Sequence, residues 1–225
     1  MSTALLSIDE RARRAARFWD RMAHRYARGA IADRAGYERT LERTAHWLAP
    51  QHDLLEIGCG TGATALRLAP AVRTLRATDV SGEMIAIARQ RLQAQPVPGL
   101  SFERAGADQA LAGGARYDGV LAFSLLHLLP DLDATLGAVA GALRPGGLFI
   151  SKTPCIAEMN LLVRRVAVPL VGAFGLMPPL GAFDGAQLQA ALRRQGFELL
   201  AHERHGSRGA DVRAFVVART RGGQG

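Results

Sequence analysis

The stretch Leu54–Ala65, with the sequence LLEIGCGTGATA, constrains the fold of this chain more than any other segment. An apolar run that ends at a glycine is typical of a buried strand, and the residues after the loop have the pattern of a helix. Gly58, Gly60 and Gly62 alternate between the two elements. Glycine allows a tight turn and lets a ligand approach the main chain, so this loop predicts a nucleotide site between a strand and a helix.

The rest of the chain alternates short apolar runs with helical patterns. This alternation favours an α/β fold, a doubly wound, mostly parallel Rossmann-like sheet covered by helices on both faces. The last two runs are too close in sequence for a crossover helix, so we expect an antiparallel strand at the end of the sheet. Seven strands are predicted, within residues 52–58, 72–80, 100–106, 116–129, 145–153, 197–205 and 212–220.

The 225 residues are enough for a single domain with a sizeable core. No repeat or low-complexity segment divides the chain. We expect one domain, 1–225, that comprises an N-terminal helical cap (1–50), a nucleotide-binding core (51–152), an apolar insertion (153–184), and a C-terminal helix with a strand pair (185–225).

Asp79 ends the second predicted strand, 21 positions after Gly58. A carboxylate there can accept hydrogen bonds from both hydroxyls of an adenosine ribose, although it could also cap the next helix. Gly58, Gly60 and Ala63 satisfy the dinucleotide pattern, which keeps a nicotinamide-dependent oxidoreductase open. Glu56, just before the loop, is unfavourable beside a pyrophosphate and suits a cationic amino acid.

Four segments, LLEIGCGTG, ATDVSGEMIAIAR, YDGVLAFSLLHLLPD and ALRPGGLFI, resemble the class I S-adenosylmethionine-dependent methyltransferases over about Asp53–Ser151. The opening FWDRMAHRYA is similar to the start of the ubiquinone/menaquinone-type small-molecule methyltransferases. The resemblance implies S-adenosylmethionine as cofactor, S-adenosylhomocysteine as product, and an open choice of acceptor. A second alternative is a methyltransferase-like protein that binds the cofactor without catalysis.

The resemblance implies that the cofactor lies around the glycine loop. Glu56 and the backbone of Gly58 are expected near its methionine ammonium, Gly60 beneath the adenosine, and Asp79 at the ribose hydroxyls. Cys59 belongs to the same contact surface. The sequence pairs no base with this thiol, so we do not expect a nucleophilic cysteine.

The resemblance also implies contacts to adenine. Val80 or Met84 is expected against the adenine face, and Asp108, beside the backbone of Ala107, at the adenine amino group. Many relatives read Gly-Asp-Ala and then Leu-Pro here, whereas this chain reads GADQALAGG. Asp108 therefore has a second interpretation, as the cap of a short helix.

Phe123 and Ser124, at the end of the fourth predicted strand, are expected to line the methyl-donor channel. Methyl transfer is an in-line displacement in which the protein mainly positions the nucleophile. His127 is the candidate base, with a structural histidine at a strand end as the alternative. Tyr26, on the first helix, is a candidate to close over the site, with core packing as the alternative.

The segment Val166–Phe183 contains no charged side chain. Its prolines and glycines argue against a membrane-spanning helix. One interpretation is a buried insertion; the other is a lid over the acceptor pocket that touches a lipophilic substrate or a membrane surface, with Arg164 and Arg165 at the headgroups. We therefore expect a small, apolar or amphiphilic acceptor and a peripheral membrane contact through 164–183.

The net charge of +8 is almost entirely arginine, because Lys152 is the only lysine. The arginines are spread along the chain apart from a cluster at Arg11–Arg25, and no basic run interleaves with aromatic residues. A nucleic-acid partner is therefore not expected. Cys59 and Cys155 suggest neither a metal site nor a disulfide, and the apolar run at the start is too short for a signal peptide. These features favour a cytoplasmic protein.

Overall fold

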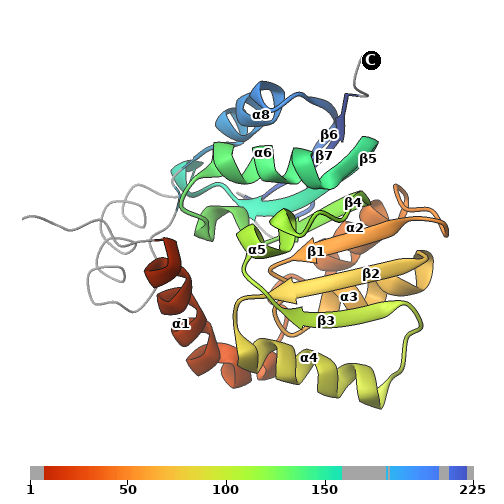
Figure 1. Cartoon of the computed structure of the whole chain (residues 1–225), viewed down its shortest axis with the longest axis vertical. Helices are drawn as coiled ribbons and strands as arrows, with labels where there is room; N and C mark the ends of the chain where they lie inside the picture. Colours follow the sequence, from red (N-terminus) through yellow and green to blue (C-terminus); the bar gives the residue numbers. More distant parts are fainter. Residues whose placement is uncertain (1–7, 159–180, 182, 208–212, 222–225) are drawn as a thin grey trace, which may run out of the picture.

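The computed structural model describes residues 8–158, 181, 183–207 and 213–221. This part forms a seven-stranded sheet of order β3-β2-β1-β4-β5-β7-β6 (Figure 1). β1 to β5 pair in parallel, and β7 is antiparallel to both β5 and β6, as predicted. The strands are β1 (Asp53–Ile57), β2 (Thr74–Asp79), β3 (Leu100–Arg104), β4 (Tyr117–Phe123), β5 (Leu143–Pro154), β6 (Phe197–Arg204) and β7 (Arg213–Thr220).

Helices cover both faces of the sheet, because successive side chains of a strand point to opposite faces and both sets are apolar here. Leu54 of β1 packs with α2, α3 and α4, whereas Leu55 packs with α5, α6 and α8. The helices are α1 (Ile8–Arg28), α2 (Arg34–Ala45), α3 (Ala63–Leu68), α4 (Gly82–Ala94), α5 (Ala107–Ala112), α6 (Leu132–Ala142) and α8 (Gly185–Arg194), with short 3₁₀ turns at Ala69–Ala71, Leu126–Leu128 and Ile156–Glu158.

The two helices of the expected cap have different positions. Leu41 of α2 packs into the core on one face of the sheet. In contrast, α1 crosses the end of the sheet to which the arrowheads of β1 and β2 point, and its Ala23 packs against Met84 and Ile87 of α4 (Figure 1). Of the segment 1–50, α1 is therefore the part that lies over the carboxyl ends of the strands, where ligands of such sheets bind.

Most of the predicted insertion lies outside the described residues, including all of 159–180. At its end, Gly181 donates a backbone hydrogen bond of 2.7 Å to the carbonyl of His127. Phe183 is buried in the core with α8. Among the helices that the structure describes, none has the length and apolar character needed to cross a bilayer.

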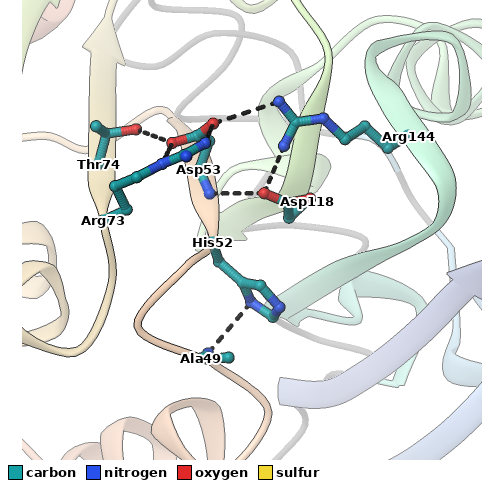
Figure 2. A network of polar contacts seen from close by, with 7 residues as sticks. All are labelled: Ala49, His52, Asp53, Arg73, Thr74, Asp118 and Arg144. Carbon is teal, nitrogen blue, oxygen red and sulfur yellow. Dashed lines mark hydrogen bonds and ion pairs between the residues drawn. The ribbon is translucent and has the colours of Figure 1, made fainter.

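A network of charged side chains lies at the amino edge of the sheet (Figure 2). Asp53 forms ion pairs with Arg73 and Arg144 and accepts a hydrogen bond of 2.7 Å from Thr74 Oγ1. Asp118 pairs with Arg144 and accepts the Asp53 backbone N–H at 2.8 Å. These contacts, led by that of Arg73, lower the pKa of Asp53 below its usual range. Carboxylates at this edge are therefore stable in their charged form.

Candidate functional site

The glycine loop follows β1 at the carboxyl edge, beside the switch in strand order between β1 and β4. Gly58 and Gly60 have φ values of +69° and +55°, a region that favours glycine. A Cβ on Gly58 would lie 2.6 Å from a terminal methyl of Leu125, so that side chain would have to shift to admit it. A Cβ on Gly60 would meet nothing closer than Tyr26, at 3.9 Å. The backbone of Gly60 is therefore the part of the loop that a ligand can approach.

Asp79, at the end of β2, holds the loop in place. Its Oδ2 accepts the Gly60 N–H and its Oδ1 accepts the Ser81 N–H, both at 2.9 Å. Burial raises the pKa of Asp79, while the two N–H donors oppose the shift. Each carboxylate oxygen retains acceptor capacity for a second donor, such as a ribose hydroxyl. The turn interpretation and the ligand interpretation of Asp79 are thus compatible.

Glu56, on β1, is the most constrained carboxylate near the loop. Its residue surface is 1% exposed, and its Oε2 has no hydrogen-bond partner among the described residues. Burial raises the pKa of Glu56 to about 8, and the nearby Asp79 adds to the shift. A buried carboxylate without a partner is unfavourable, and a cation beside it would restore the charged form. The methionine ammonium of S-adenosylmethionine fits this requirement.

Tyr26 reaches the loop from α1, the helix that crosses the carboxyl edge of the sheet (Figure 1). Its ring lies beside Gly60 and makes an edge contact with Trp19, with ring centroids 6.4 Å apart. Burial raises the pKa of the Tyr26 hydroxyl, and Asp79 and then Glu56 raise it further, although 57% of the residue surface is exposed. The phenol therefore stays protonated at neutral pH and is not a base there.

Cys59 is buried beneath the loop, and its N–H donates to the carbonyl of Thr78 at 2.9 Å. Burial raises the pKa of its thiol well above the usual value, with Glu56 and Asp79 adding to the shift. The thiol is protonated and is a poor nucleophile. Cys59 is therefore not expected to act as a nucleophile, and its contact with the cofactor stays a prediction.

The two residues expected at the adenine face differ in their surroundings. Val80 is partly exposed after β2. Met84 is only 2% exposed and packs against Ala23 of α1. Met84 therefore supports the α1 contact, and Val80 is the better placed of the two for a ligand.

Ala107 and Asp108 begin α5, after β3. The preceding strand end is fixed by a backbone hydrogen bond of 3.0 Å from Ala105 to the carbonyl of Asp79. Ala107 is partly buried, and Asp108 is exposed in the first turn of the helix. The N-terminus of the helix is closed by Gln109, whose side chain accepts the Gly106 N–H at 3.1 Å. The fold thus places Asp108 beside the strand that carries Asp79.

Phe123, Ser124 and His127 follow β4. Ser124 is exposed and has φ +54°, a left-handed conformation that is uncommon outside glycine and is found at functional sites. Its N–H donates to the carbonyl of Lys152 at 2.7 Å. His127 Nδ1 lies 3.2 Å from Thr153 Oγ1, and burial lowers the pKa of the imidazole to about 4. His127 is therefore neutral at physiological pH.

The structure adds residues that the sequence did not single out. Asp20 accepts a hydrogen bond of 2.6 Å from Ser81 Oγ. Arg91 donates to the carbonyl of Thr61 at 3.0 Å and to that of Ala27 at 3.3 Å. These contacts hold α1 against the glycine loop and α4. No short motif marks them, because the partners of both residues are far away in sequence.

No group of three metal-ligating side chains gathers within the described ranges. The site consists of the backbone of a glycine loop, two buried carboxylates and one tyrosine.

Residues 55–149 match the family described as methyltransferase domain. This segment of the chain is similar in sequence to methyltransferase domains. The match begins at β1 and ends within β5, so it covers the strands that carry the loop, Asp79 and Ser124. It confirms the predicted resemblance to class I methyltransferases and supports S-adenosylmethionine as the cofactor of the domain.

Two curated relatives show the same sequence identity to this chain. An uncharacterized methyltransferase of Emericella nidulans is 29% identical over 164 residues, which cover 65% of this chain and 57% of that protein. A ubiquinone biosynthesis O-methyltransferase of Methylobacterium nodulans is 29% identical over 120 residues, 53% of this chain and 46% of that protein. The chain thus matches about half the length of these relatives.

Among solved structures, a magnesium protoporphyrin IX methyltransferase from Synechocystis, crystallised with S-adenosylmethionine, superposes with a TM-score of 0.72. The alignment covers 97% of this chain and 100% of that chain at 18% identity. This similarity confirms the predicted Rossmann-like methyltransferase fold.

Proposed function

We propose that this chain transfers a methyl group from S-adenosylmethionine to a small, lipophilic or amphiphilic acceptor. The observation that carries the proposal is Glu56, a buried carboxylate whose Oε2 has no partner among the described residues and which adjoins an approachable glycine backbone. A nucleotide that also carries an ammonium satisfies both features. The methyltransferase family match supports the same cofactor.

Within this proposal, each residue around the loop has a defined role. Glu56 binds the methionine ammonium of the cofactor, and Asp79 accepts from the ribose hydroxyls while it keeps its backbone donors. Gly60 lies under the adenosine. Val80 contacts the adenine face, and Asp108 accepts from the adenine amino group.

The cofactor supplies an electrophilic methyl group on a sulfonium, so the remaining task of the protein is to orient the acceptor. A histidine with a pKa of about 4 is a weak base at neutral pH. We therefore assign His127 to accepting a hydrogen bond from the acceptor rather than removing its proton outright. Phe123 and Ser124 line the approach to the cofactor. Tyr26 donates a hydrogen bond to the bound ligand beside the glycine loop.

The lipophilic character of the acceptor is inferred from the uncharged sequence Val166–Phe183, most of which lies outside the described residues. The names of two similar proteins refer to ubiquinone biosynthesis and to magnesium protoporphyrin IX. A peripheral membrane contact of a cytoplasmic enzyme through 164–183 is part of this proposal.

The proposal is tested first by ligand binding. S-adenosylhomocysteine should raise the melting temperature of the protein, and a nicotinamide dinucleotide should not. The opposite result would indicate the oxidoreductase alternative.

Incubation with isotopically labelled S-adenosylmethionine and a lipid-and-metabolite extract, followed by mass spectrometry, should then reveal the methylated acceptor. Binding of the cofactor with no labelled product from any extract would favour the non-catalytic alternative.

A further inference from the structure

Five arginines form one continuous row on the outside of α1. Their spacing along the chain is three, four, four and three residues, so on a helix of 3.6 residues per turn they fall within an arc of about 80°. The row extends for about 21 Å at 1.5 Å per residue. All five side chains are exposed. We call this set the arginine stripe: Arg14, Arg17, Arg21, Arg25 and Arg28.

The charges of the arginine stripe are not neutralised by the rest of the described structure, where none of the five forms an ion pair with a carboxylate. Other exposed arginines do form ion pairs, as in Arg67 with Glu38 at 2.8 Å and Arg194 with Asp133 at 2.8 Å. The acidic residue in the middle of α1, Asp20, instead accepts hydrogen bonds at the start of α4. The stripe is therefore an unscreened positive surface.

The opposite face of α1 is already occupied. Ala23 is fully buried and packs with Met84 and Ile87, and Trp19 packs against the same cluster. A helix whose apolar face is covered in this way cannot insert that face among acyl chains. Any membrane interaction of α1 must therefore be electrostatic adsorption through the arginines.

We propose that the arginine stripe docks the protein on an anionic lipid surface. A straight row of cations on the outside of one helix matches a plane of lipid phosphates. Bases of a single-stranded nucleic acid would need several aromatic platforms along the row of cations. Phe18, which follows Arg17, is only partly exposed and makes an edge contact with Trp19 at 5.0 Å, and Tyr26, which follows Arg25, lies beside Gly60. The proposal goes beyond methyl transfer and does not depend on it. Because α1 also carries Tyr26 beside the glycine loop, docking keeps that loop close to the surface that holds lipophilic molecules.

The test is co-sedimentation of the full chain with vesicles of phosphatidylcholine alone or with 3:7 phosphatidylglycerol to phosphatidylcholine, a composition of roughly one-third anionic lipid chosen to give a negative surface potential. The stripe variant R17Q/R21Q/R25Q is compared with R67Q/R194Q/R219Q, which removes the same charge from exposed arginines that form ion pairs elsewhere. Each arginine near an anionic surface contributes roughly fivefold to partitioning, so the stripe variant should bind about a hundredfold more weakly. The control variant should bind as the parent protein does.

Three further measurements make the result decisive. The variant R17K/R21K/R25K should retain binding, because adsorption depends on charge. About 0.5 M salt should release the parent protein, since the screening length is then only about 4–5 Å. Circular dichroism and S-adenosylhomocysteine affinity should match the parent in every variant, which separates docking from folding and from cofactor binding.

Equal losses in the stripe and control variants would overturn the proposal, as would binding to neutral vesicles that survives high salt. Stripe-dependent binding to a labelled DNA or RNA duplex without vesicle binding would assign the surface to nucleic acid instead.

Discussion

Two acidic residues on the same strand, Asp53 and Glu56, have opposite environments. Asp53 lies at the amino edge of the sheet, where Arg73 and Arg144 lower its pKa (Figure 2). Glu56 lies three residues further along and is buried with no cation paired to it in the described part of the chain, and its pKa is raised to about 8. The first carboxylate is satisfied by the protein itself, whereas Oε2 of the second has no hydrogen-bond partner among the described residues.

This difference follows from what surrounds each end of β1. Arg73, which directly precedes β2, and Arg144 of β5 both reach Asp53. Around Glu56 the nearby charge is another carboxylate, Asp79, and the loop beyond contributes only backbone. Perturbed carboxylates without a structural partner mark functional sites more often than paired ones do. The comparison predicts that changes at the carboxyl edge alter binding, and changes at the amino edge alter stability.

The largest effect is expected for Glu56→Gln. Loss of the buried charge should weaken S-adenosylhomocysteine binding by about 2–4 kcal/mol, because the ligand ammonium would be left unpaired. Isothermal titration calorimetry measures this loss, with Asp53→Asn as the matched control. Equal affinities of the Glu56→Gln variant and the parent would place the ammonium elsewhere.

Asp79→Ala should reduce cofactor affinity by about 1–3 kcal/mol through unpaired ribose hydroxyls. The variant also loses the acceptor for the Gly60 and Ser81 N–H groups, so its melting temperature should fall. Comparing the affinities for S-adenosylhomocysteine and 2′,3′-dideoxy analogues separates the two effects. If the parent binds both ligands equally well, Asp79 has only the turn role.

The stability of the ligand-free protein should depend on pH through Glu56. Its folded pKa of about 8 exceeds the ordinary carboxyl value of 4.5, so the folded state binds the proton more tightly. The contribution is complete below about pH 4.5 and is lost as pH rises toward 8, with a slope of at most about 1.4 kcal/mol per pH unit. Urea unfolding of the parent and of Glu56→Gln across this range measures it. If the free energy of unfolding of Glu56→Gln varied with pH as steeply as that of the parent, this pH dependence would not come from Glu56.

The smallest effect is expected for Asp53→Asn, a destabilisation of about 1 kcal/mol, since the network is partly exposed to solvent. The lowered pKa of Asp53 gives the opposite sign of pH dependence, with stability present at neutral pH and lost on acidification. Thermal unfolding at neutral and acidic pH checks both statements. A large loss of cofactor affinity in this variant would contradict the prediction that changes at the amino edge alter stability and not binding.

Local patterns were sufficient to predict the sheet and its glycine loop. The alternation of apolar runs and helical patterns predicted seven strands and the antiparallel end, and both are confirmed. Serine favours the N-cap position of a helix, and Ser81 Oγ accepts the Met84 N–H at 3.1 Å at the start of α4. These features depend on residues within a few positions of each other, which is why the sequence is enough.

The sequence could not distinguish the roles of residues whose partners are distant. Met84 was a candidate for the adenine face, but the packing of α1 buries it against Ala23. Likewise, His127 was a candidate base, and only its buried environment reveals that its pKa is lowered. Neither fact has a signature in spacing or composition.

By itself, the sequence determined the order of elements, the positions of the loop glycines and the presence of acidic residues at the ends of two strands. Periodicity and turn chemistry are local, so they survive in a one-dimensional pattern. Only the tertiary structure decided which carboxylate is paired and which is not, because pKa shifts arise from burial and from charges that folding brings together. In the same way, the arginine cluster in the sequence became a single exposed stripe only once α1 had packed its other face onto α4.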